Sequence, residues 1–321
     1  MKVWQKIRSL WIIGALFALV VSTVVSAAGT TNTLKIGFLT AEDELPLYVG
    51  VERGDFARGG VDLQLVTFVS AVERDTALRA GQVDGIVCDL IALGLFAKGR
   101  MDVKATSISL GATPGEGRFA LLAGPNSGVE KISDLKGVPV GISNNSIIEF
   151  VNYQLLKAAG FADSEIKTVE IPKVPVRVEL LLKGQIKAAT LPDPFASLAE
   201  AQGAKLLASD TDSEINLSPI VYIFSSKTIK EKKAVLERFY QIYSDIVTEI
   251  NANPEAYRSY MVEYCKVPKA IEEVYPVPTF SLPTLPTKAE WELVMDWMVA
   301  KGMLKTAFPY EQYFDASFVK Q

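Results

Sequence analysis

The chain of 321 residues contains no histidine. This absence excludes Ser-His-Asp triads, Cys-His dyads and metal sites that rely on imidazole ligands. Cysteine is nearly as scarce, with Cys88 and Cys265 as the two examples. Because Cys88 lies in an apolar, strand-like stretch, we predict a buried free thiol there, and a disulfide between the two cysteines is the alternative. We expect no cofactor and no metal.

Basic residues are fewer than acidic ones, with 33 Lys and Arg against 37 Asp and Glu, which gives a formal net charge of −4. Lys2, Lys6 and Arg8 precede an apolar run over residues 10–21, which ends in small residues up to position 28. This pattern is typical of a secretory signal peptide, and the run is shorter than the roughly 20 residues that span a membrane. We therefore predict a cleavable signal over residues 1–28 and a periplasmic or otherwise extracytoplasmic protein. An uncleaved membrane anchor is the alternative.

Removing these three positive charges lowers the net charge from −4 to −7. The remaining sequence has no basic stripe, which argues against nucleic acid as a partner. It is also too long for one simple core, so that two lobes are expected.

Short apolar stretches alternate with longer helical patterns along this part of the chain. This repetition predicts an α/β protein with parallel sheets covered by helices on both faces. The predicted helices cover residues 46–57, 70–80, 89–95, 146–159 and 176–183. The predicted strands cover residues 34–39, 61–66, 85–88, 119–123, 137–142, 167–171, 186–191 and 220–224. A proline-rich stretch over 274–286 is interpreted as a packed, extended connector to the last helices.

Two helix starts carry a capping-box pattern, Ser70 with Glu73 and Ser146 with Glu149. Each follows a predicted strand, so both helix starts should lie at carboxyl ends of strands. Ligands of open α/β sheets bind at that edge.

Five short motifs occur in a fixed order along the chain, at residues 51–56 (VERGDF), 80–85 (AGQVDG), 132–140 (ISDLKGVPV), 191–195 (LPDPF) and 297–304 (WMVAKGML). In this order the chain resembles the type II periplasmic binding proteins of ABC importers. The nearest branch covers nitrate, sulfonate and taurine binders and the binders of pyrimidine precursors of thiamine.

This resemblance implies a two-lobed Venus-flytrap fold of type II with two hinge crossovers. Lobe boundaries are then expected at 33–118 plus 222–321 for one lobe and 119–217 for the other. The implied function is that of a monomeric, non-enzymatic binding protein, which captures a small molecule between the lobes and delivers it to an ABC permease. Closure would follow from ligand contacts to both lobes.

The resemblance also places the ligand site in the loops at the strand ends. The expected ligand-binding residues are Thr40, Ser70, Ala71, Asp89, Arg118, Ser143, Asn145, Ser146, Asp193 and Tyr222. Several of them have a purely structural alternative, because Thr40, Ser70 and Asp89 are placed to cap helices and Tyr222 to fill a core. Glu42, in the first of these loops, is expected to face solvent.

The charges at this predicted site favour one class of ligand over another. Asp89, Asp193 and Glu149 surround the mouth, whereas Arg118 is the one well-placed cation. A buried carboxylate facing an anion is costly, so a ligand with an amine, amidine or heteroaromatic ring is favoured. A Ser/Asn-rich site for sulfonate or nitrate is the alternative. Two other functions stay open, a chorismate-processing-like enzyme on the same fold and a ligand-sensing partner of a receptor.

Overall fold

The computed structural model describes residues 32–113 and 115–319. The predicted signal peptide, residues 1–28, lies outside this part of the chain. None of the helices described is long and apolar enough to cross a membrane.

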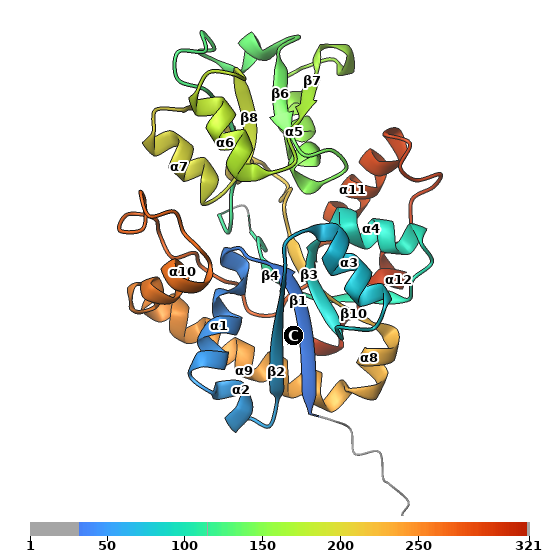
Figure 1. Cartoon of the computed structure of the whole chain (residues 1–321). Helices are drawn as coiled ribbons and strands as arrows, with labels where there is room; N and C mark the ends of the chain where they lie inside the picture. Colours follow the sequence, from blue (N-terminus) through green and yellow to red (C-terminus); the bar gives the residue numbers. More distant parts are fainter. Residues whose placement is uncertain (1–31, 114, 320–321) are drawn as a thin grey trace, which may run out of the picture. The chain divides into compact units, whose positions relative to one another are not determined.

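Two five-stranded sheets organise the described residues (Figure 1). The first sheet, in the order β2-β1-β3-β10-β4, contains β1 (Thr33–Leu39), β2 (Asp62–Phe68), β3 (Gly85–Asp89), β4 (Val103–Leu110) and β10 (Ile220–Ser225). The second, in the order β7-β6-β8-β5-β9, contains β5 (Phe119–Ala123), β6 (Pro139–Ile142), β7 (Lys167–Glu170), β8 (Ala188–Pro192) and β9 (Lys205–Ser209). We call the first sheet with its helices lobe 1 and the second lobe 2. The chain leaves lobe 1 after β4 and returns with β10, so that two crossovers join the lobes, as the sequence predicted.

The sheets are mixed rather than parallel, and the prediction of parallel sheets was wrong in this respect. Strand β10 runs antiparallel to β3 and β4, and β5 runs antiparallel to β8 and β9. Each of these two strands follows a crossover and enters its sheet from the other lobe. Strand direction there depends on how the lobes are connected, and local sequence carries no signal for it.

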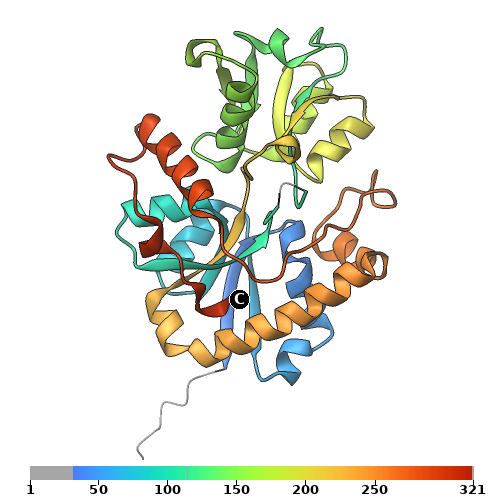
Figure 2. The same cartoon turned by 180° about the vertical axis from the view of Figure 1, so that it is seen from behind.

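Helices cover both faces of each sheet (Figures 1 and 2). Along β10, Val221 and Ile223 pack into one core with α4 and α11, whereas Tyr222 and Phe224 pack into another with α1 and α9. This alternation is the period of two of a strand buried on both faces. The helices of lobe 1 are α1 (Leu45–Glu52), α2 (Asp55–Arg58), α3 (Ala71–Arg79), α4 (Leu90–Lys98), α8 (Ser226–Glu231), α9 (Lys233–Ala252), α10 (Arg258–Tyr264), α11 (Lys288–Ala300) and α12 (Tyr310–Tyr313). Lobe 2 contains α5 (Ile147–Ala158), α6 (Val174–Leu182) and α7 (Phe195–Ala201).

Several element boundaries differ from the predictions for physical reasons. The helix predicted over 46–57 is divided into α1 and α2 at Gly54, which has a φ of +73° that favours glycine. Strand β4 was missed because its buried positions include Thr106, Ser107 and Ser109, which hide the apolar pattern. Helix α7 and strand β9 were missed as well; β9 is an edge strand whose residues are mostly half-exposed or exposed.

Cys88 and Cys265 are both buried and unpaired, which confirms the free thiol and excludes the disulfide.

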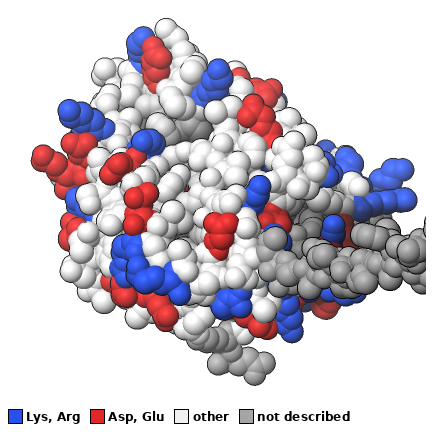
Figure 3. Space-filling view, turned by 60° about the horizontal axis from the view of Figure 1, so that its bottom comes forward, with Lys and Arg blue, Asp and Glu red and all other residues white. Residues whose placement is uncertain are grey.

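Figure 3 shows one face of the molecule, on which Lys and Arg are interspersed with Asp and Glu. No continuous basic stripe crosses this face.

Candidate functional site

A cavity of about 220 Å³ lies where the crossovers meet the carboxyl ends of strands from both sheets. Its size suits a small molecule rather than a macromolecule. From lobe 1 it is lined by the ends of β1, β3 and β4 and by Glu42, Asp43 and Glu44. From lobe 2 it is lined by the start of α5 and by Pro192 and Asp193 at the end of β8. Both lobes therefore contribute to one site, as expected for open α/β sheets.

Six of the 21 residues that line this cavity are acidic. Glu42, Asp43 and Glu44 follow one another in a 3-10 turn before α1, and their exposed fractions are 6%, 7% and 1%. Burial raises the pKa of Glu42 to about 8 and that of Asp43 to about 6, and it raises the pKa of Glu44 well above its ordinary value. Cavity residues with such shifts are typical of functional sites.

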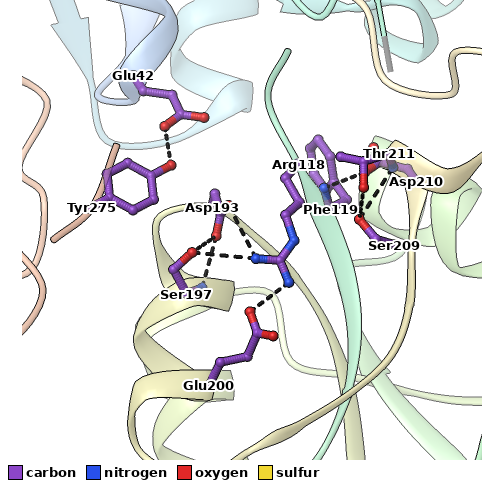
Figure 4. Close-up of polar contacts among 10 residues, drawn as sticks. All are labelled: Glu42, Arg118, Phe119, Asp193, Ser197, Glu200, Ser209, Asp210, Thr211 and Tyr275. Carbon is purple, nitrogen blue, oxygen red and sulfur yellow. Dashed lines mark hydrogen bonds and ion pairs between the residues drawn. The ribbon is translucent and has the colours of Figure 1, made fainter. Parts of the chain in front are cut away.

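Glu42 does not face solvent, and the prediction that it would was wrong. Tyr275, in the connector between α10 and α11, covers it and donates a hydrogen bond from its hydroxyl to Oε2 of Glu42 (Figure 4). Tyr275 is 6% exposed. Sequence reasoning missed Tyr275 because it is 233 positions from Glu42. The signal that was available is the apolar character of the proline-rich connector, which indicated packing without indicating a partner.

Asp193 lines the cavity from lobe 2, and its side chain is 8% exposed. Its Oδ1 accepts hydrogen bonds from the backbone N–H of Ser197 at 2.9 Å and from the Ser197 hydroxyl at 2.8 Å (Figure 4). Its Oδ2 lies 3.7 Å from Nη1 of Arg118. Burial raises the pKa of Asp193, although Arg118 and Ser197 act in the opposite direction.

Arg118 is the cation that the sequence placed at the cavity, and it does line it. Its charge is shared, because Nη2 pairs with Glu200 at 2.6 Å while Nη1 faces Asp193 (Figure 4). Two carboxylates of lobe 2 therefore offset one guanidinium. Little of its positive charge is left for an anionic ligand.

Arg74 is a second cation at the cavity that sequence reasoning missed. It is 5% exposed, pairs with Asp75 at 2.8 Å and donates to the carbonyl oxygen of Val87 at 3.0 Å. It lies on the buried face of α3, one turn after the predicted site residues Ser70 and Ala71, and no sequence pattern marks it. Two arginines thus face six acidic side chains of the cavity wall, namely Glu42, Asp43, Glu44, Asp89, Glu116 and Asp193.

Asp89 caps a helix and also lies at the cavity, so its helix cap is confirmed and its contact with a ligand stays a prediction. Its Oδ1 accepts a hydrogen bond from the backbone N–H of Ala92 at 2.8 Å and so caps α4, and the residue also lines the cavity. Burial raises its pKa, and the Ala92 hydrogen bond and Arg74 oppose that shift.

The structure does not bring the other predicted residues to this cavity. Thr40 and Ala71 are exposed, and Ser70 caps α3 by accepting from the backbone N–H of Glu73 at 3.3 Å. Tyr222 is fully buried in lobe 1 against Phe239, with 5.8 Å between the ring centroids. Ser143, Asn145 and Ser146 lie in the loop between β6 and α5, next to the lining residues Ile147 and Ile148.

The capping box predicted at Ser146 was wrong. The Ser146 hydroxyl donates to the carbonyl oxygen of Ser143 at 2.7 Å instead of capping α5, and Glu149 accepts from the backbone N–H of Asn145. A buried guanidinium, Arg177, organises the same loop by donating to Ser143 and to the carbonyl oxygens of Ile171 and Thr190.

Among the described residues, no group of three or more His, Cys, Asp or Glu side chains is arranged to hold a metal ion.

Comparison with known proteins places the chain in a family. The sequence model described as NMT1/THI5 like matches residues 42–257, which is more than half of the chain. The chain belongs to the NMT1/THI5-like family. This agrees with the branch of type II periplasmic binding proteins that the five motifs indicated. No curated protein sequence matches the chain.

Solved structures share the fold of this NMT1/THI5-like protein at low identity. The periplasmic aliphatic sulphonate binding protein SsuA from Escherichia coli matches with a TM-score of 0.74 and 16% identity, over 87% of this chain and 96% of that chain. The ligand-binding component of an ABC-type import system from Staphylococcus aureus, with zinc bound, gives 0.72 and 14% over 90% and 98%. The desulfurization enzyme DSZB gives 0.67 and 15% over 89% and 97%. The TM-scores show a shared two-lobed fold, and at such low identities they show the fold alone.

Proposed function

We propose that this protein is an extracytoplasmic solute-binding protein of an ABC importer, and that its ligand is a small molecule carrying a cationic amine, amidine or heteroaromatic ring. The family and the fold support the first part. One structural neighbour is named the ligand-binding component of an ABC-type import system, and another is named a periplasmic sulphonate binding protein. The observation that carries the second part is the excess of buried carboxylic acids over arginines in the cavity.

A cationic ligand would offset the electrostatic cost of burying these carboxyl groups in their ionised form. Asp193 on lobe 2 is close enough to Glu42 on lobe 1 that its charge helps to raise the pKa of Glu42. A positively charged ligand between them would favour the ionised form of both carboxyls and would attract both lobes. A sulfonate or nitrate would instead add negative charge beside them, which is costly where water is excluded.

An enzyme on the same fold is the second candidate, because Cys88 lines the cavity and one structural neighbour is named an enzyme. Two facts weigh against it. Burial raises the pKa of the Cys88 thiol well above its ordinary value, so the thiolate nucleophile is scarce. The chain also lacks histidine, the residue that most often acts as the general base beside a cysteine.

A thermal-shift screen of the mature protein tests the proposed ligand class. The panel should contain putrescine, spermidine, arginine and 4-aminopyrimidines on one side and taurine, ethanesulfonate and nitrate on the other. A cationic ligand at a hundredfold excess over its Kd should stabilise the protein by about 2.7 kcal/mol. At one fixed concentration of an aliphatic amine such as spermidine, which stays protonated in this range, the stabilisation should be larger at pH 8 than at pH 6, because Glu42 and Asp43, with pKa values of about 8 and 6, ionise over this range.

The Asp193→Asn variant provides the matched test of the site. Asparagine keeps an oxygen that accepts from Ser197, so the local fold should survive while the negative charge is lost. We expect binding of the cationic ligand to weaken about thirtyfold, or about 2 kcal/mol. The control is Asp163→Asn, which removes an exposed carboxylate of the same lobe outside this cavity. Stabilisation by sulfonates or nitrate alone would overturn the cationic ligand, and conversion of a bound compound into product would favour the enzyme.

The proposal also requires export. We expect protein recovered from the extracytoplasmic fraction to begin at Ala28 or Gly29, because a small-residue cleavage site ends the signal pattern. Intact-mass measurement and N-terminal sequencing decide this. Recovery of the full-length chain from the membrane fraction would show an uncleaved anchor instead.

A further inference from the structure

Helix α5 of lobe 2 contacts helix α11 of lobe 1 outside the cavity. Phe150 on α5 and Trp297 on α11 meet edge to face, with 5.4 Å between ring centroids and an interplanar angle of 71°. Phe150 is fully buried and Trp297 is 6% exposed. The contact is therefore a packed apolar junction between the lobes.

An ion pair lies directly beside this junction. Nζ of Lys301, which follows α11, pairs with Oε1 of Glu149, and it also lies 5.5 Å from the centroid of the Trp297 ring. The exposed fractions of the two side chains are 30% for Lys301 and 12% for Glu149. Partial burial weakens solvent screening, so this pair is stronger than a fully exposed one.

The second carboxylate oxygen of Glu149 contacts the loop of lobe 2 that leads to the cavity wall. Oε2 accepts a hydrogen bond of 2.6 Å from the backbone N–H of Asn145, in the loop between β6 and α5. Asn145 has a φ of +55°, a left-handed conformation that Asn tolerates better than most residues. Ile147 and Ile148, just after this loop, line the cavity. One carboxylate thus connects the wall of the cavity to α11.

We propose that Glu149 is a positioning residue that couples the cavity wall of lobe 2 to α11 and so restricts the opening of the two lobes. Among the ion pairs of the described residues, the Glu149–Lys301 pair alone joins lobe 2 to the C-terminal part of lobe 1, at the residue that follows α11. Opening the lobes moves α5 relative to α11, and this motion must break or strain the pair. Loss of the pair therefore raises the population of more open states in the absence of ligand.

Distance measurements between spin labels on the two lobes test this proposal without a ligand. Val72→Cys and Val176→Cys supply the label sites, at side chains that are 76% and 41% exposed. Cys88 and Cys265 are buried and should stay unlabelled. Lys301→Met removes the charge and keeps an unbranched side chain, and Glu149→Gln keeps an oxygen that accepts from Asn145. Each variant should raise the population of longer distances about fivefold, which is what loss of about 1 kcal/mol produces.

Three further variants make the result decisive. Lys301→Arg should restore the wild-type distance distribution, and the double variant Glu149→Gln with Lys301→Met should open no further than either single variant. Lys183→Met is the control: it breaks the exposed ion pair between Glu179 on α6 and Lys183 at the end of that helix, and it should leave the distance distribution unchanged. Unaltered distances in both single variants would overturn the proposal. A distribution that also widens between two labels within lobe 2 would overturn it too, because Glu149 would then act on the local fold rather than between the lobes.

Discussion

The Glu42→Gln variant should be more stable than the wild type at pH 8 and nearly equal to it at pH 5. Burial raises the pKa of Glu42 from 4.5 to about 8, so the folded protein keeps a proton that the unfolded chain loses between these values. Because the folded state binds more protons in this window, the free energy of unfolding falls as the pH rises from 4.5 to 8. Glutamine removes this ionisation while its amide oxygen still accepts from Tyr275.

We expect the stabilisation by Glu42→Gln to grow by about 3 kcal/mol from pH 5 to pH 8, at about 1.4 kcal/mol for each pKa unit. Chemical denaturation of both proteins at the two pH values measures it. Glu52→Gln at the exposed end of α1 is the control and should show no such growth. Equal stability of wild type and Glu42→Gln at pH 8 would mean that Glu42 is not held in its neutral form. The same variant should lose binding of the cationic ligand, which is the familiar exchange of stability for function.

Trp291→Ala should cause a large loss of stability, about 3–5 kcal/mol. Trp291 is fully buried on α11, and its indole N–H donates to the carbonyl oxygen of Phe308 at 2.8 Å. Its ring packs against Phe314 with 5.3 Å between centroids. Phe314 in turn forms an isolated β-bridge with Ala105 on β4. Packing of Trp291 against Phe314 therefore stabilises the C-terminal segment on the first sheet.

Differential scanning calorimetry of Trp291→Ala and Trp291→Phe separates packing from hydrogen bonding. Phenylalanine fills most of the space and loses the bond to Phe308, so it should cost about 1–3 kcal/mol. If alanine costs no more than phenylalanine, the ring is not a packing anchor. Because α11 also carries Trp297 and positions Lys301 just after its end, Trp291→Ala should in addition widen the distances between the lobes.

The sequence alone determined the class of fold. The alternation of apolar stretches and helical patterns predicted strands at the positions of β1, β2 and β3, of β5 through β8 and of β10, because strand and helix periodicity are local properties of a chain. The same locality explains why Asp89 and Asp193 could be placed at the cavity, since Asp89 ends strand β3 and Asp193 directly follows strand β8. The five ordered motifs named the family that the sequence model matches.

The tertiary structure alone decided the directions of β5 and β10 and the charge of the cavity. Glu42 is buried because Tyr275 folds over it, Arg74 reaches the cavity from the inner face of α3, and Glu149 meets Lys301 from another helix. Each of these arrangements joins residues that are far apart in the chain. Periodicity and capping act over one or two turns of the backbone, so they fix which segment forms an element. They do not determine which distant side chain removes a carboxyl from water, and that removal is what sets its pKa and its role.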